Sequence, residues 1–108
     1  MAIHLKSTHI IIEQALVASV FGSETHAFVA YVPEQEALLI TPVSSQWFAK
    51  MHEPKQYLLK DKNLKGDKSL AVRDIFIDFE LEEKDKMLSY ELVEKTNLLK
   101  VKLNKSEI

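Results

Sequence analysis

The chain has 108 residues and a mass of 12.4 kDa, which fits a single globular domain over 1–108. It contains no cysteine, which excludes disulfides, thiolate nucleophiles and cysteine-ligated metal centres. Its two glycines, Gly22 and Gly66, are too few for a glycine-rich loop around a phosphate. The formal net charge of −2 provides no overall electrostatic field that would attract nucleic acid or an anionic membrane. We also expect no cofactor.

The N-terminal residues Met1-Ala2-Ile3-His4-Leu5 lack the basic flank and continuous apolar stretch of an export signal. The apolar run 27–32 is far shorter than the roughly 20 residues that a membrane helix needs. We therefore expect a cytoplasmic protein that does not bind a membrane.

The charges are grouped by sign along the chain. The segment 50–68 is basic, 74–94 is acidic, and 95–108 is basic again. Such blocks can pair within the fold or between subunits, and the simpler explanation is a set of solvated strand faces and turns.

The segment 8–21 is rich in β-branched residues, including the run Ile10-Ile11-Ile12. The alternative to a strand is a helix that Thr8 caps and Gly22 ends. We favour the strand because consecutive isoleucines are restricted at χ1 and fit a helix less well.

The clearest prediction is a hairpin of strands 27–32 and 37–41. The polar loop Pro33-Glu34-Gln35-Glu36 joins them, and Pro42 ends the second strand because it cannot donate to a ladder. A short helix near 44–52 follows, which Ser44 or Ser45 can cap and Pro54 stops.

The second half of the chain alternates apolar and polar residues, which predicts strands. A short strand is expected at 57–59, before a polar turn at 61–68. The longest alternating run, 72–81, predicts a strand with Ile75, Ile77 and Phe79 facing the core. Two further strands are expected near 88–92 and 99–103.

No internal repeat or linker is visible, and every connection is short enough to join antiparallel strands. The predicted fold is α+β. It is a mostly antiparallel β-sheet or partly open small barrel of about 6–7 strands, with one short helix near 44–52.

A metal site is one hypothesis for the expected strand 72–81. Asp78 and Glu80 would lie on one face, where two carboxylates can bind a hard cation. The favoured alternative is a solvated strand face that pairs with the lysines of a neighbouring strand, Lys100 and Lys102.

A ligand pocket is the other candidate site. Arg73 is the only arginine, and an inward guanidinium would need an anionic partner. His52, Trp47 and Tyr57 would line the same pocket, although core packing explains the aromatic residues more simply. No catalytic residue is assigned, because the sequence has no nucleophile motif such as G-x-S-x-G.

Three functions follow, in order of preference. The first is a non-catalytic protein that self-associates as a homo-oligomer, in the simplest case a dimer, or docks a protein partner through edge strands and charge blocks. The second is a small-ligand-binding protein or small enzyme that uses the pocket of Arg73, His52, Trp47 and Tyr57. The third, nucleic-acid binding through 47–68, is the least favoured, because acidic residues cancel half of the lysine charge there.

Overall fold

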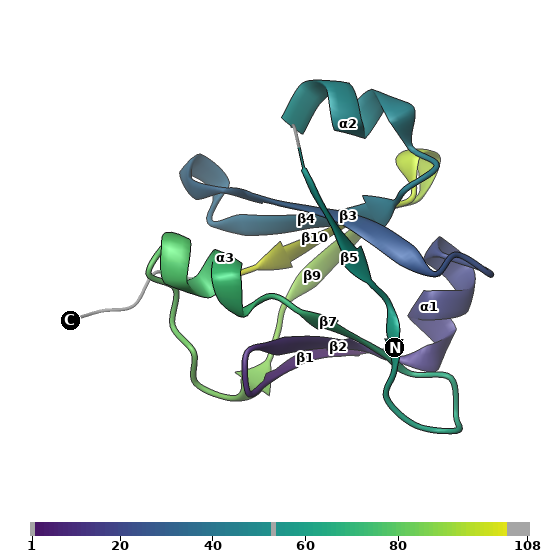
Figure 1. Ribbon diagram of the computed structural model, residues 1–108, viewed down its shortest axis with the longest axis horizontal. Helices are drawn as coiled ribbons and strands as arrows, with labels where there is room; N and C mark the ends of the chain where they lie inside the picture. Colours follow the sequence, from purple (N-terminus) through teal and green to yellow (C-terminus); the bar gives the residue numbers. More distant parts are fainter. Residues whose placement is uncertain (1, 53, 104–108) are drawn as a thin grey trace.

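The computed structural model describes residues 2–52 and 54–103. Over these ranges the chain forms ten strands in two antiparallel sheets, together with three α-helices. The sheets lie one above the other, with α2 outside the upper sheet and α1 and α3 at opposite ends (Figure 1). The predicted α+β class with antiparallel sheets is confirmed, and the sheets do not close into a barrel.

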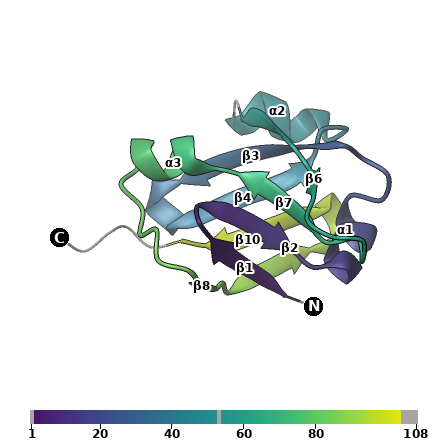
Figure 2. The same ribbon diagram turned by 60° about the horizontal axis from the view of Figure 1, so that its bottom comes forward.

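Sheet A, the lower sheet of Figure 1, has the strand order β6-β7-β2-β1-β8. These strands are β6 (Lys60–Asp61), β7 (Lys68–Ala71), β2 (His9–Ile12), β1 (Ile3–Lys6) and β8 (Lys86–Met87). Alternate residues such as Leu5, Ile10 and Leu70 are buried between the sheets. Among the described residues, no helix crosses the other side of this sheet (Figure 2).

Sheet B has the strand order β5-β3-β4-β10-β9. These strands are β5 (Lys55–Leu58), β3 (His26–Val32), β4 (Ala37–Pro42), β10 (Leu98–Lys102) and β9 (Tyr90–Val93). The predicted hairpin is the pair β3–β4, in which Val32 lies opposite Ala37. Its loop is a 3₁₀ turn, η1 (Pro33–Gln35), followed by Glu36 in the left-handed region at φ 49°.

The prediction of one strand over 8–21 is wrong beyond Ile12. After β2 the chain forms α1 (Gln14–Val20), whose buried residues Leu16, Val17 and Val20 follow helical spacing. The isoleucines lie in the strand, where β-branched residues fit. Gly22, at φ 57°, follows the helix, as the helical alternative expected.

The predicted strand over 72–81 is also wrong. Its first half is a helix, α3 (Arg73–Asp78), which buries Ile75 and Phe76 and leaves Ile77 60% exposed. The spacing of Ile75, Phe76 and Phe79 fits one face of a helix. The alternation of apolar and polar residues over 72–81 fits a strand equally well, so the sequence pattern is ambiguous. Asp74 also lies in the first turn, where a carboxylate complements the helix dipole.

The helix predicted near 44–52 is confirmed as α2 (Gln46–His52). Its Phe48 is fully buried against Ala37 and Leu39 on the outer side of sheet B. The main core lies between the sheets and draws residues from both of them and from α1 and α3. None of the helices in the described ranges is long and apolar enough to cross a membrane.

The two halves of the chain share one topology that the sequence does not reveal. In each, a hairpin of sheet A leads to a helix and then to a hairpin of sheet B. The first half runs β1-β2-α1-β3-β4, and the second runs β6-β7-α3-β8-β9-β10, in which β8 is an additional edge strand of sheet A. Strands β2 and β7 pair in sheet A, and β4 and β10 pair in sheet B, both antiparallel. This arrangement has the pattern of an approximate two-fold axis between the halves, with β5 and β8 outside the repeat.

The two hairpins of sheet B repeat their loop geometry closely. After β9, a 3₁₀ turn, η2 (Glu94–Thr96), precedes Asn97 at φ 51°, as η1 precedes Glu36 at φ 49°. The amide of each left-handed residue donates to a carbonyl three residues earlier, at 3.3 Å and 3.1 Å respectively. The backbone thus repeats although the side chains differ.

Candidate functional site

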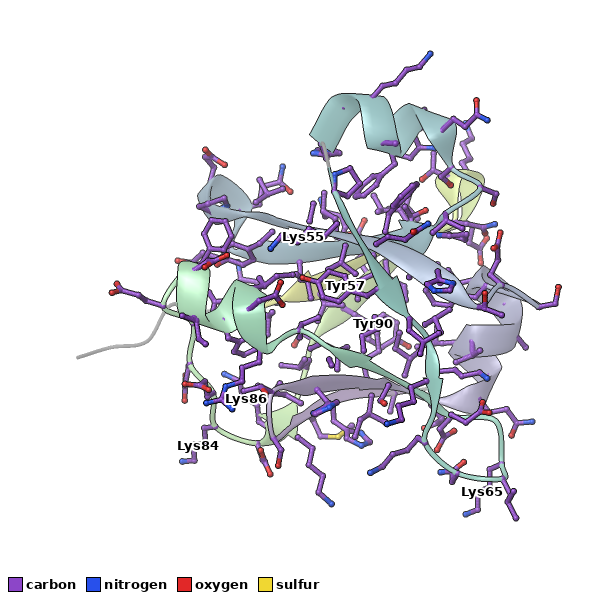
Figure 3. The ribbon with its side chains drawn as sticks, viewed as in Figure 1. Lys55, Tyr57, Lys65, Lys84, Lys86 and Tyr90 are labelled. Atoms are coloured by element: carbon purple, nitrogen blue, oxygen red, sulfur yellow. The ribbon has the colours of Figure 1, made fainter. Side chains whose placement is uncertain are left out.

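A small pocket lies where the end of α2 meets β5 and α3. It has a volume of about 170 Å³ and includes His52, Lys55 and Asp78 in its lining. Chain segments far apart in sequence meet here because β5 pairs with β3 and because Phe79, directly after α3, packs on Tyr31 of β3 with ring centroids 4.9 Å apart. Lys55, which lines the pocket, and Tyr57 both project from β5 (Figure 3).

A hydrogen-bonded cluster of Lys55, Tyr57 and Asp74 ties β5 to α3. The Tyr57 hydroxyl donates to Asp74 Oδ2 at 2.6 Å, and Lys55 Nζ donates to the same oxygen at 3.1 Å. Burial raises the pKa of Tyr57, and its hydrogen bond to Asp74 raises it further. Burial acts to raise the pKa of Asp74, but the hydrogen bonds from Tyr57 and Lys55 outweigh it and lower that pKa. The phenol therefore holds its proton and the carboxylate its charge, which suits a structural tie better than a catalytic base.

The structure brings only part of the expected ligand pocket together. His52 lines the small pocket, with its ring centroid 4.8 Å from that of Phe48, and Tyr57 lies in the adjacent cluster. Trp47 packs edge-on against Phe48 and does not line that pocket. Arg73 is exposed at the first position of α3 rather than turned inward on a strand.

The strand that was to align Asp78 and Glu80 does not exist. Asp78 is the last residue of α3, and Glu80 follows the helix in the left-handed region at φ 51°. Lys100 lies opposite Glu91 of β9 instead of opposite either carboxylate. Within 2–52 and 54–103, no group of three or more histidine, aspartate or glutamate side chains is close enough to hold a metal ion.

The edge strand β9 and a hollow beside it form a second candidate site, which the sequence alone does not indicate. The hollow has a volume of about 440 Å³ and is lined by Ser89, Glu91, Lys100 and Lys102, among others. It lies on the outer side of sheet B, where β9 pairs with β10. The alternation of Leu99 and Val101 with Lys100 and Lys102 predicted the outward lysines, but only the pairing places Glu91 beside them.

The approximate two-fold axis relates this hollow to the surface on which α2 rests. The row Ala30-Leu39-Lys100-Glu91 crosses sheet B from β3 to β9, so the axis exchanges Leu39 with Lys100 and Ala30 with Glu91. The half of this row beneath α2, Ala30 and Leu39, is apolar, whereas the half on β10 and β9, Lys100 and Glu91, is charged. A helix therefore covers the first side, while the second remains hollow.

A comparison of the chain with protein-family models, curated proteins and solved structures found no match.

Proposed function

We propose that this protein is a non-catalytic association protein that binds a second copy of itself through β9. The observation that carries the proposal is the asymmetry of sheet B. On one side β3 is flanked by β5, whereas its counterpart β9 is the last strand in the described part of the sheet. An edge strand offers backbone amides and carbonyls to a further strand, and a second copy offers the same edge.

The side chains of β9 are suited to an added strand. Leu92 faces the core and is only half-buried, so the hydrophobic layer between the sheets continues to this edge. A neighbouring strand would cover that remaining apolar surface, which favours association. On the opposite side, Glu91 beside Lys100 presents both signs of charge, which limits repulsion between two identical surfaces.

The alternation of side chains restricts how two such strands can pair. In a continuous antiparallel sheet, residues directly opposite each other point to the same side. A two-fold axis places one residue of β9 opposite the same residue of the partner, and for an axis at the middle of the strand that residue is Leu92 or Glu91. Like charges directly opposite are destabilising, so the register centred on Leu92 is favoured.

The test measures the mass of the particle as the concentration rises. In sedimentation equilibrium we expect twice the 12.4 kDa of one chain at high concentration. Leu92→Lys places an inward-facing charge at this edge, and we expect it to give monomers. Leu58→Lys, on β5 at the opposite edge of the same sheet, is the matched control and should still dimerise.

A second measurement does not depend on variants. Amide hydrogen exchange of the wild-type protein should slow in 90–93 as the concentration rises, while β5 amides stay unchanged. A particle that stays monomeric at millimolar concentration would contradict the proposal. A dimer that survives Leu92→Lys in a folded protein would show that another surface joins the copies.

A further inference from the structure

A third hollow lies on the outer side of sheet A, which no helix of residues 2–52 and 54–103 covers (Figure 2). It has a volume of about 370 Å³. Ile11, only 3% exposed, and Ser69 lie opposite each other on β2 and β7 and form its floor. It is distinct from the β9 edge, which belongs to the other sheet.

The hollow is surrounded by positive charge. Lys6, Lys60 and Lys62 line it together with His9. Strand pairing brings these residues together from distant parts of the chain: Lys6 lies opposite His9, and Lys60 opposite Ser69. The acidic residue in the lining, Asp61, already forms an ion pair with Lys68.

The hairpin turn that holds Lys6 and His9 in place has a strained backbone. Ser7 and Thr8 adopt φ angles of 49° and 61°, a region that glycine or asparagine normally occupies and that is unfavourable for β-branched threonine. Both residues are held from outside the turn, since Asp85 Oδ1 accepts from the Ser7 amide at 2.9 Å and the Thr8 carbonyl accepts from the Val72 amide at 3.2 Å. Backbone strain of this kind is concentrated at binding sites.

The same turn orients the imidazole of His9. Its Nδ1 lies 2.9 Å from the Ser7 carbonyl, which can only accept, so Nδ1 carries the hydrogen. The remaining ring nitrogen, Nε2, is then the atom of His9 that can meet a ligand. A ring protonated at both nitrogens donates from Nε2 to a phosphate oxygen, and the lysine ammonium groups and the Ser69 hydroxyl supply the other donors.

We propose that this hollow binds a small molecule carrying a phosphate group. Its volume is in the range of small-ligand sites, and its cationic rim matches an anion. A hollow with two buried residues, Ile11 and Ser69, as its floor favours a compact ligand over a polymer, which would need an extended track of charge. Lys65 and Lys84 lie further out, on loops at opposite ends of this side of the molecule (Figure 3).

The test uses inorganic pyrophosphate as the probe, titrated calorimetrically into the full chain at fixed ionic strength. We expect saturable binding with one site per chain. Replacing both Lys6→Gln and Lys60→Gln should weaken binding by at least about ten-fold, because each lysine would donate to a charged group. The double variant Lys50→Gln and Lys95→Gln removes the same charge from exposed positions outside the hollow, and it should bind as the wild type does.

Each other result overturns the proposal. If pyrophosphate does not saturate at millimolar concentration, the hollow is not a phosphate site. Equal weakening in both double variants would show general charge attraction only. Binding of a single-stranded oligonucleotide without binding of pyrophosphate would assign this side of the sheet to nucleic acid. Circular dichroism and thermal unfolding establish that each variant is folded before it is titrated.

Discussion

The Tyr57 hydroxyl donates a 2.6 Å hydrogen bond to Asp74 Oδ2 and so joins the edge strand β5 to the helix α3. It acts together with the pairing of β5 with β3 and with the exposed bond from Lys55 to the same carboxylate oxygen. The bond therefore contributes to stability at the place where the sequence analysis expected a ligand pocket.

Replacing Tyr57→Phe should lower the free energy of unfolding by about 1–2 kcal/mol, since the bond is part-buried and its acceptor is charged. The companion variant is Lys55→Gln, which removes the other donor to the same oxygen. Its side chain is 64% exposed, so we expect a loss below about 0.5 kcal/mol. Urea unfolding of both variants measures the difference, and equal losses would contradict it.

Asp74 should make stability depend on pH in the acid range. Its folded pKa lies below the ordinary value of 3.8, so its contribution is complete above that value and is lost as the pH falls through the lower folded pKa. We expect Asp74→Asn to reduce the loss of stability between neutral pH and about pH 3. Urea unfolding at both pH values tests this, and an unchanged pH dependence in the variant would count against it.

The left-handed residues of the two sheet B hairpins should respond differently to glycine. Glu36 and Asn97 have nearly the same φ, but asparagine tolerates this conformation better than glutamate. Glu36→Gly should raise the free energy of unfolding by about 0.5–1 kcal/mol. Asn97→Gly should change it by less than about 0.3 kcal/mol. Thermal unfolding of the pair provides the comparison, and a larger gain at Asn97 would refute the explanation.

Neighbouring residues of α3 should differ sharply in their effect on stability. Phe76 is 1% exposed and Ile77 is 60% exposed. Phe76→Ala should cost about 3–4 kcal/mol, as expected for a large core side chain. Ile77→Ala should cost less than about 0.5 kcal/mol. A strand at this position would reverse the order, so chemical denaturation of the two variants also tests the helix.

Local signals predicted the elements whose boundaries the sequence marks chemically. The loop opened by Pro33 and the proline at the end of β4 set the β3–β4 hairpin, and serines beside Pro42 preceded α2. The segment 72–81 has no such marker, and its apolar residues fit the period of a helix as well as that of a strand. Pairing of β7 with the distant β2 determines where the strand stops and α3 begins.

The candidate site depended more on such distant pairing. Tyr57 and Asp74 meet only because β5 and α3 lie together, and Lys6 reaches Lys60 only across β2 and β7. Spacing along the chain cannot express these relationships. It does identify His52, which lines the small pocket, and Tyr57 in the adjacent cluster, whereas the inward position predicted for Arg73 requires a strand where the chain forms α3.

The shared topology of the two halves has a consequence for folding kinetics. The central pair of each sheet joins one half to the other, as where Ile10 lies opposite Leu70 and Ile40 opposite Leu99. Neither sheet can be completed until segments from both halves have met, so much of the loop-closure entropy is lost before the core forms. Such a high contact order implies folding in milliseconds to seconds rather than microseconds. Because each half supplies strands to both sheets, a chain divided between α2 and β5 would leave both fragments without a complete sheet.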